Sequence, residues 1–210
     1  MQIAFLLFDG ITPLDAIGPY EVLGKIPGAE PVFVASESRV YRTKGGTLGL
    51  QADRTLADVQ HPNVLVIPGG PGADAAAEDV EITEWVAYAH EHATTWTTSV
   101  CTGALVLGGA GVLVGLEATT HWRAREDLKK WGAIPVARRV VRQGKVWTAA
   151  GVSSGIDMAL ALAAEIAGEA VAEAIQLGLE YAPEPPFAAG RFEDAPAARI
   201  ELARSGLNRP

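Results

Sequence analysis

Residues 97–109 read TTSVCTGALVLGG, and the fold class follows from the change of character within this stretch. Residues 94–100 are rich in β-branched side chains, which predicts a buried strand, whereas residues 102–114 have the composition of a helix. An abrupt change from strand to helix is typical of a sharp turn whose central side chain projects over the edge of a sheet. That residue is Cys101, the only cysteine among 210 residues.

Strand and helix signals alternate along the rest of the chain. Further buried strands are expected at residues 3–8, 31–35 and 63–67, extended pieces flanking a turn within 40–50, and a pair of strands within 134–148. Helices are expected at residues 14–26, 82–93, 122–131, 155–167 and 170–181. This alternation predicts an α/β fold with a mostly parallel sheet covered on both faces. Ligands bind such sheets beyond the carboxyl ends of the strands, so the segments after residues 8, 67 and 100 are the candidate site.

The composition, with 49% hydrophobic and 20% charged residues, is that of a globular protein long enough to bury a core. A net charge of −8 argues against a nucleic-acid partner, because phosphate binding needs clustered Lys and Arg. No run of about 18 apolar residues predicts a membrane span, and the N-terminus lacks the basic flank and cleavage site of a signal peptide. A single cysteine excludes an internal disulfide, so we expect a cytoplasmic protein.

Two roles are open for Cys101 on local pattern alone. At a strand-to-helix turn the unpaired N–H groups of the helix start would stabilise a thiolate, and Gly103 would permit the close helix–strand approach. Free cysteine is equally one of the most buried residue types, and a buried structural thiol is inert. The local sequence therefore leaves a nucleophile and a core residue as equal alternatives.

Two other segments would meet Cys101 at the same sheet edge. Residues 66–73 (VIPGGPGA) form a glycine-rich loop, which is a donor loop for developing negative charge, a tight turn, or a phosphate cradle that lacks P-loop spacing. Asp15 lies in an apolar setting after the first strand. One possibility is that Asp15 is a buried acid, in which case desolvation would raise its pKa. The other is that it caps a helix or lies at the surface. The local sequence alone favours the second role.

The histidines add little. His90 and His92 are two residues apart on an expected helix and point in different directions, so no metal site is expected. His121 follows a short expected strand and is either a base for Cys101 or a hydrogen-bonded structural residue.

Taken together, these segments resemble the ThiJ/PfpI superfamily, which shares its fold with class I glutamine amidotransferases, and most closely its isonitrile hydratase branch. The residues that carry the resemblance are 14–19 (LDAIGP), 67–70 (IPGG), 99–108 (SVCTGALVLG), 118–122 (ATTHW), 151–157 (GVSSGID) and 179–187 (LEYAPEPPF). The elbow motif is specific to the superfamily, and the Tyr-Ala-Pro segment narrows the match to the branch. The resemblance implies a flavodoxin-like three-layer α/β/α sandwich with a nucleophile elbow, built as one domain over 1–210 with a Pro-rich extension from about residue 183.

The resemblance also implies roles for matching residues. Cys101 would be the nucleophile and Asp15 the catalytic acid, at a position where many other superfamily members carry glutamate. Thr102 would orient the acid or the substrate, and Gly70 with the Thr102 backbone would supply N–H donors. His121 is left outside this set. The resemblance implies no metal and no cofactor. It does imply that the protein is a homodimer.

The implied reaction is the addition of water to an isocyanide, giving an N-substituted formamide through a thioimidate on Cys101. Two alternatives remain: a glyoxalase- or deglycase-like enzyme acting on aldehydes, and a non-enzymatic sensor whose cysteine is oxidised. The resemblance also fits regulators that carry a helix-turn-helix unit. The short sequence after the Pro-rich segment and the acidic balance argue against that reading.

Overall fold

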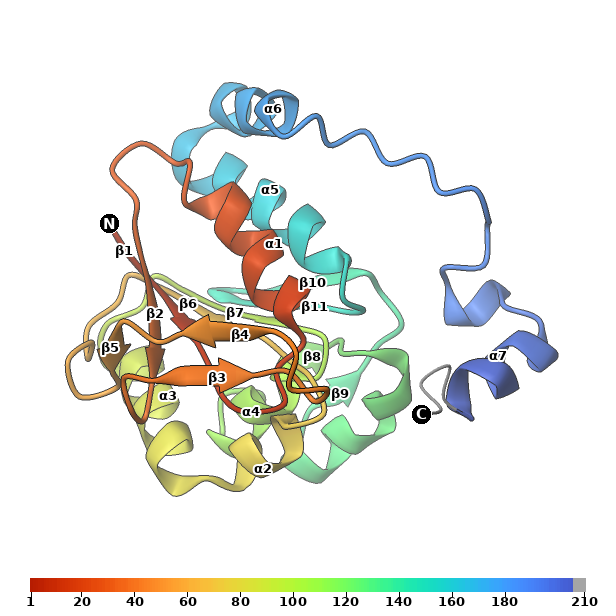
Figure 1. Cartoon of the computed structure of the whole chain (residues 1–210), viewed down its shortest axis with the longest axis horizontal. Helices are drawn as coiled ribbons and strands as arrows, with labels where there is room; N and C mark the ends of the chain where they lie inside the picture. The colour runs from red at the N-terminus through yellow and green to blue at the C-terminus, as the bar shows by residue number, and fades with distance from the viewer. Residues whose placement is uncertain (206–210) are drawn as a thin grey trace. The chain divides into compact units, whose positions relative to one another are not determined.

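The computed structural model describes residues 1–205, and the chain divides into two units, residues 1–179 and 180–210. The first unit is a three-layer sandwich, with a sheet between two layers of helices (Figure 1). This architecture confirms the predicted α/β class and the flavodoxin-like sandwich.

The sheet has seven strands in the order β10-β11-β7-β6-β1-β2-β5. They are β1 (Gln2–Leu6), β2 (Glu30–Ala35), β5 (Arg54–Thr55), β6 (Val64–Ile67), β7 (Trp96–Val100), β10 (Val140–Gln143) and β11 (Val146–Ala149). All neighbours run parallel except β10, which pairs antiparallel with β11. Two small sheets pair β3 (Val40–Arg42) with β4 (Gly49–Gln51) and β8 (Glu117–Ala118) with β9 (Ile134–Pro135). The carboxyl ends of β1, β6 and β7 therefore lie side by side, as the sequence predicts.

Each face of the sheet has its own apolar core, because side chains alternate between faces along a strand. On one face, Phe5 and Val66 pack with α1 (Pro13–Leu23), α5 (Ser154–Ala167) and α6 (Glu169–Gly178). On the other face, Leu65 and Ile67 pack with α2 (Ala73–Glu78), α3 (Val80–His92) and α4 (Gly103–Gly109). Figure 1 shows these two helical layers on opposite sides of the strands.

Several elements differ from the sequence prediction, three of them around the site. The helix expected at 102–114 ends at Gly109, and the chain turns at Gly111, whose φ of +75° does not continue a helix. The segment expected as one helix at 122–131 forms two 3₁₀ helices, η1 (Trp122–Ala124) and η2 (Glu126–Trp131). Helix α2 was not expected, because six residues of mostly alanine and acid carry no apolar periodicity.

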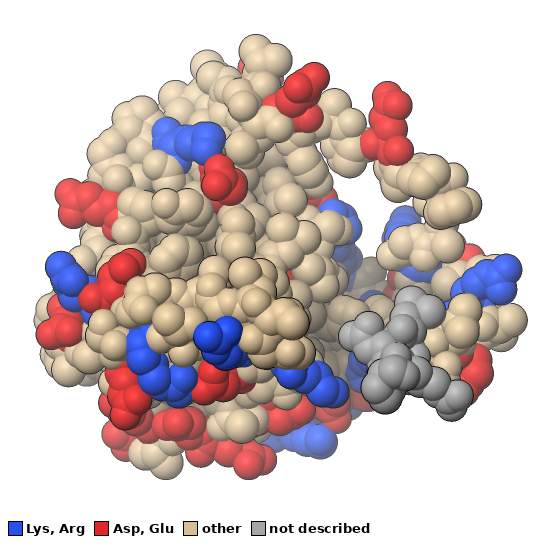
Figure 2. All heavy atoms as spheres, viewed as in Figure 1, with Lys and Arg blue, Asp and Glu red and all other residues tan. Residues whose placement is uncertain are grey.

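The second unit contains η3 (Phe192–Asp194) and α7 (Ala197–Arg204), which the sequence did not predict. It begins close to the expected Pro-rich extension, of which residues 206–210 lie outside the described part. Within residues 1–205, no helix has the length and apolar character needed to cross a membrane. On the face seen in Figure 2, basic and acidic side chains are interspersed over the first unit.

Close approach of β6 and α4 depends on Gly103. A Cβ built on Gly103 would lie 2.2 Å from the carbonyl oxygen of Ile67 and 2.7 Å from that of Pro68. Both are backbone atoms on a buried strand and its loop, so they have little freedom to move away. Only glycine allows α4 to begin this close to the neighbouring strand.

We therefore expect Gly103→Ala to lower the free energy of unfolding by about 2 kcal/mol, the usual scale of overpacking a core. Gly178→Ala is the matched control, because a Cβ there meets nothing within 4 Å and alanine favours a helix. Denaturant unfolding of the two variants measures the difference. Equal stabilities would contradict the packing described above.

Candidate active site

Cys101 stands on a strained turn between β7 and α4. Its φ is +55°, one of two positive values among the non-glycine residues described. Such a conformation costs about 1–3 kcal/mol and persists only where the surroundings enforce it. The turn is the elbow that residues 97–109 predict, and it leaves the Cys101 side chain 5% exposed.

Asp15 approaches the same point from α1. It is the third residue of that helix, it is fully buried, and one carboxyl oxygen accepts a hydrogen bond of 3.0 Å from the Gly69 amide. The helix begins after Thr12, so Asp15 does not cap it. Its second carboxyl oxygen, Oδ1, has no hydrogen-bond partner among the described residues. The carboxyl is therefore an internal acid with one acceptor atom available to a ligand or water.

Burial raises the pKa of Asp15 from 3.8 to about 7, while the Gly69 amide and the Cys101 thiol act in the opposite direction. Of the two roles that the local sequence leaves open, the structure shows the buried acid, and the capping or surface role that the local sequence favours is wrong. A carboxyl whose pKa lies near neutral pH can both donate and accept a proton there.

The Cys101 thiol has its pKa raised to about 12, first by burial and then by the charge of Asp15. The backbone amide and hydroxyl of Thr102 lower it, as expected of a helix start, but their effect is the smaller one. Because an ionised Asp15 contributes to this rise, the two groups titrate as a pair. Between pH about 7 and about 12 the pair holds one proton, mainly on the thiol beside a carboxylate. Transfer of that proton to Asp15 gives the form with a thiolate.

The glycine-rich loop holds both groups in place. The Gly70 amide donates to the Thr102 hydroxyl at 2.8 Å, and that hydroxyl donates back to the Gly70 carbonyl at 3.1 Å. A Cβ on Gly69 would lie 2.4 Å from the Thr102 amide nitrogen. The structure thus brings Gly70 and Thr102 to Cys101, as the sequence predicts, but it engages the Gly70 amide with Thr102. The prediction that Gly70 donates to substrate stays open.

His121 lies nearby without joining this pair. Its Nδ1 accepts from the Arg123 amide at 3.4 Å, and burial followed by Arg123 and Arg125 lowers its pKa. Among the described residues, His121 and Cys101 share no hydrogen bond.

Sequence reasoning missed Thr120, the residue before His121. Its hydroxyl donates to the Cys101 carbonyl at 2.6 Å, and its side chain is fully buried. The ATTHW motif at residues 118–122 indicates that this segment is important. Within the motif, His121 was considered as a candidate base and Thr120 was not.

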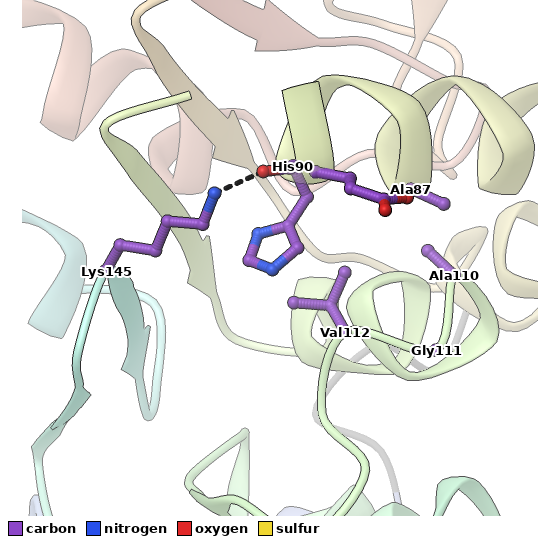
Figure 3. Close-up of a pocket in the computed structure, with 7 residues that line it drawn as sticks. Ala87, His90, Ala110, Gly111, Val112 and Lys145 are labelled. Atoms are coloured by element: carbon purple, nitrogen blue, oxygen red, sulfur yellow. Dashed lines mark hydrogen bonds between the residues drawn. The ribbon is translucent and has the colours of Figure 1, made fainter. Parts of the chain in front are cut away.

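A separate hollow of about 440 Å³ is lined by residues that include His90, Val112 and Lys145 (Figure 3). Lys145 there donates to the carbonyls of His90 and Thr94, which caps the C-terminal end of α3. His90 Nδ1 lies 2.9 Å from the Thr97 hydroxyl, near the start of β7 and away from its Cys101 end. The hollow is therefore not part of the candidate site. Within residues 1–205, no three His, Cys, Asp or Glu side chains are grouped to hold a metal.

The fold and the site define an α/β protein with a cysteine on a strand-to-helix elbow and a buried acid beside it. Residues 1–165 match the DJ-1/PfpI family, and the chain belongs to that family. This confirms the resemblance found in the sequence.

Individual relatives within the family show which proteins the chain is similar to. Isonitrile hydratase from Pseudomonas putida is 43% identical over 204 residues, covering 97% of this chain and 89% of that protein. A ThiJ/PfpI family protein from Pseudomonas syringae has a crystal structure that matches with a TM-score of 0.91 and 40% identity, covering 97% of this chain and 86% of that one. Deglycase PfpI from Pyrococcus furiosus is 30% identical over 155 residues, covering 71% of this chain and 89% of that protein. The chain is thus a homologue of isonitrile hydratase over nearly its full length.

Replacing the buried acid gives a stability test. The pKa of Asp15 is raised on folding, so the folded state holds this proton more tightly than the unfolded state, and wild type loses stability as pH rises from about 4 to about 7. Asp15→Asn has no such proton, so its stability relative to wild type should improve by about 4 kcal/mol between pH 4 and pH 8.

Denaturant unfolding of both proteins at several pH values measures this difference. A constant difference across that range would mean that Asp15 ionises in the folded state at its ordinary pKa.

Proposed function

We propose that this protein is an isonitrile hydratase, which adds water to an isocyanide to give an N-substituted formamide. The observation that carries the proposal is the fully buried Asp15, with a pKa of about 7, beside the Cys101 thiol on its elbow. Homology to the isonitrile hydratase of Pseudomonas putida supports the choice of substrate. An isocyanide has a carbon that accepts a proton and then becomes electrophilic, which suits one acid and one thiolate.

The first half of the reaction uses the pair in the form with protonated Asp15 and thiolate Cys101. Asp15 delivers its proton to the isocyanide carbon, and the sulfur attacks the same carbon, forming the C–S bond of a thioimidate, R–N=CH–S. The carboxylate that remains is stabilised by the Gly69 amide. Burial of the pair keeps bulk water from competing for the proton.

In the second half, Asp15 acts as the base. It takes a proton from water while the oxygen attacks the thioimidate carbon, and it passes that proton to the nitrogen. Collapse of the adduct returns the hydroxyl proton to Asp15 and breaks the C–S bond. The formamide leaves, and both groups return to their starting forms. The free acceptor Asp15 Oδ1 is the atom that would hold this water. The steps need no metal or organic cofactor.

Thr102 and Gly70 would position these groups rather than exchange protons. The Thr102 amide acts on the sulfur and lowers its pKa, and the hydrogen bonds with Gly70 fix the position of the Thr102 hydroxyl. Contact of Gly70 or Thr102 with the substrate itself remains part of the proposal.

Removing the nucleophile tests the proposal most simply. Cys101→Ala should abolish formamide production from alkyl and aryl isocyanides, and Asp15→Asn should slow it by about 10²-fold or more, the usual scale for losing a general acid or base. Chromatographic assay of the formamide measures both. Turnover near the wild-type level in Cys101→Ala would exclude a cysteine nucleophile.

The pH profile gives an independent test. Below pH about 7 the pair takes up a second proton, which leaves a thiol beside a protonated acid and no nucleophile. We expect kcat/KM to rise about tenfold per pH unit up to about 7 and then to level off, as the one-proton form becomes dominant. A profile that is flat from pH 5 to 9 would contradict a shared proton.

A second candidate is an aldehyde-directed activity through a hemithioacetal on Cys101, favoured by the 30% identity to deglycase PfpI. Parallel incubation of the purified protein with methylglyoxal and with an isocyanide separates the two. Loss of methylglyoxal without formamide formation would favour the second candidate.

Family resemblance and residue usage support three further inferences. The chain would act as a homodimer, as the superfamily resemblance implies, and sedimentation equilibrium measures this. A single cysteine favours a reducing cytoplasm as its location. The catalytic fold would be one domain, with the Pro-rich segment from about residue 183 as its extension.

A further inference from the structure

The backbone of Cys101 is held from two sides. Its amide donates to the Ala149 carbonyl of β11 at 3.0 Å, and its carbonyl accepts from the Thr120 hydroxyl at 2.6 Å. In a helix, the Leu105 amide would serve this carbonyl, but that amide donates to Thr102 instead. The Thr120 hydroxyl therefore donates to the Cys101 carbonyl, which receives no hydrogen bond from the first turn of α4.

Thr120 is itself fixed to the strand that holds the Cys101 amide. The backbone amide of its neighbour Thr119 donates to the Thr148 hydroxyl at 2.9 Å, and Thr148 precedes Ala149 on β11. Thr119, Thr120 and Thr148 are all buried, with side chains no more than 1% exposed. Both sides of the Cys101 backbone are therefore tied to β11: the amide directly through Ala149, and the carbonyl through Thr120, Thr119 and Thr148.

We propose that Thr120 is a positioning residue, whose hydroxyl holds the elbow in its left-handed conformation and so aims the Cys101 sulfur at Asp15. The proposal deepens the proposed function, since it concerns the same site. A residue at φ +55° stays there only if contacts enforce it, and Thr120 contacts the peptide unit that would rotate on relaxation. Small misplacements of a reacting group cost rate steeply.

The chain offers a matched control for this hydroxyl. Thr98 is also fully buried, and its hydroxyl also donates to a backbone carbonyl, that of Leu65, at 2.9 Å. Thr98→Val and Thr120→Val each remove one buried hydroxyl-to-carbonyl bond and keep the side-chain shape. Only Thr120→Val touches the elbow. Thr120→Ser keeps the hydroxyl and tests rescue.

Two readouts decide the proposal. The first is kcat and KM with cyclohexyl isocyanide: kcat should fall about ten- to a hundredfold in Thr120→Val with KM nearly unchanged, and Thr98→Val should stay near wild type. Thr120→Ser should recover most of the rate.

The second readout is the rate at which iodoacetamide alkylates the protein, which reports on Cys101 alone because the chain has one cysteine. Thr120→Val should react several times faster than Thr98→Val. Cys101 is only 5% exposed in the wild-type structure, and a relaxed elbow would admit solvent and reagent to its thiol.

The alkylation arm does not depend on the reaction being isonitrile hydration. If wild type makes no formamide, the proposed function fails while alkylation still tests the role of Thr120. Equal kcat losses and equal alkylation rates in Thr98→Val and Thr120→Val would overturn the proposal, since Thr120 would then contribute stability alone.

Discussion

The contact between the buried Asp15 carboxyl and the Cys101 thiol is the constraint around which the site is arranged. A carboxyl removed from water resists ionisation, and a thiol beside it resists losing the last proton that the two share. The same burial that makes this acid costly for folding gives it a pKa near neutrality, where it can both give and take a proton. The Gly69 amide limits the cost by donating to the carboxylate.

The fold brings these two groups together. Parallel strands place the ends of β1, β6 and β7 at one edge, so α1, the glycine-rich loop and the elbow converge there. Glycines at positions 69 and 103 let backbone approach backbone where a Cβ would collide. A strained Cys101 is then held by the hydrogen bonds of Ala149 and Thr120. The same arrangement explains why one carboxyl and one thiol are enough for a reaction that needs an acid, a base and a nucleophile in turn.

Much of this was predictable from sequence because it depends on local pattern. The change of character at residues 97–109 predicts the elbow, and apolar runs predict the strands that carry it. What local pattern could not predict depends on tertiary contacts. Asp15 has the local pattern of a capping or surface residue, and only its tertiary contacts with Gly69 and Cys101 identify it as a buried acid. Nothing in the local sequence distinguishes Thr120 from the other threonines. Its importance depends on the contacts that bring its hydroxyl to the Cys101 carbonyl. The engagement of the Gly70 amide by Thr102 is likewise a matter of loop geometry that spacing does not encode.

The central claim is that Asp15 keeps its proton until near-neutral pH because it is buried beside Cys101. The most direct measurement is a ¹³C NMR titration of the aspartate carboxyl carbons in the labelled protein, with Asp15→Asn to assign the signal. The structure predicts a midpoint near pH 7 for Asp15, well above its ordinary value of 3.8. A midpoint near pH 4 would contradict the account, because burial beside Cys101 would then leave the pKa of this carboxyl unchanged.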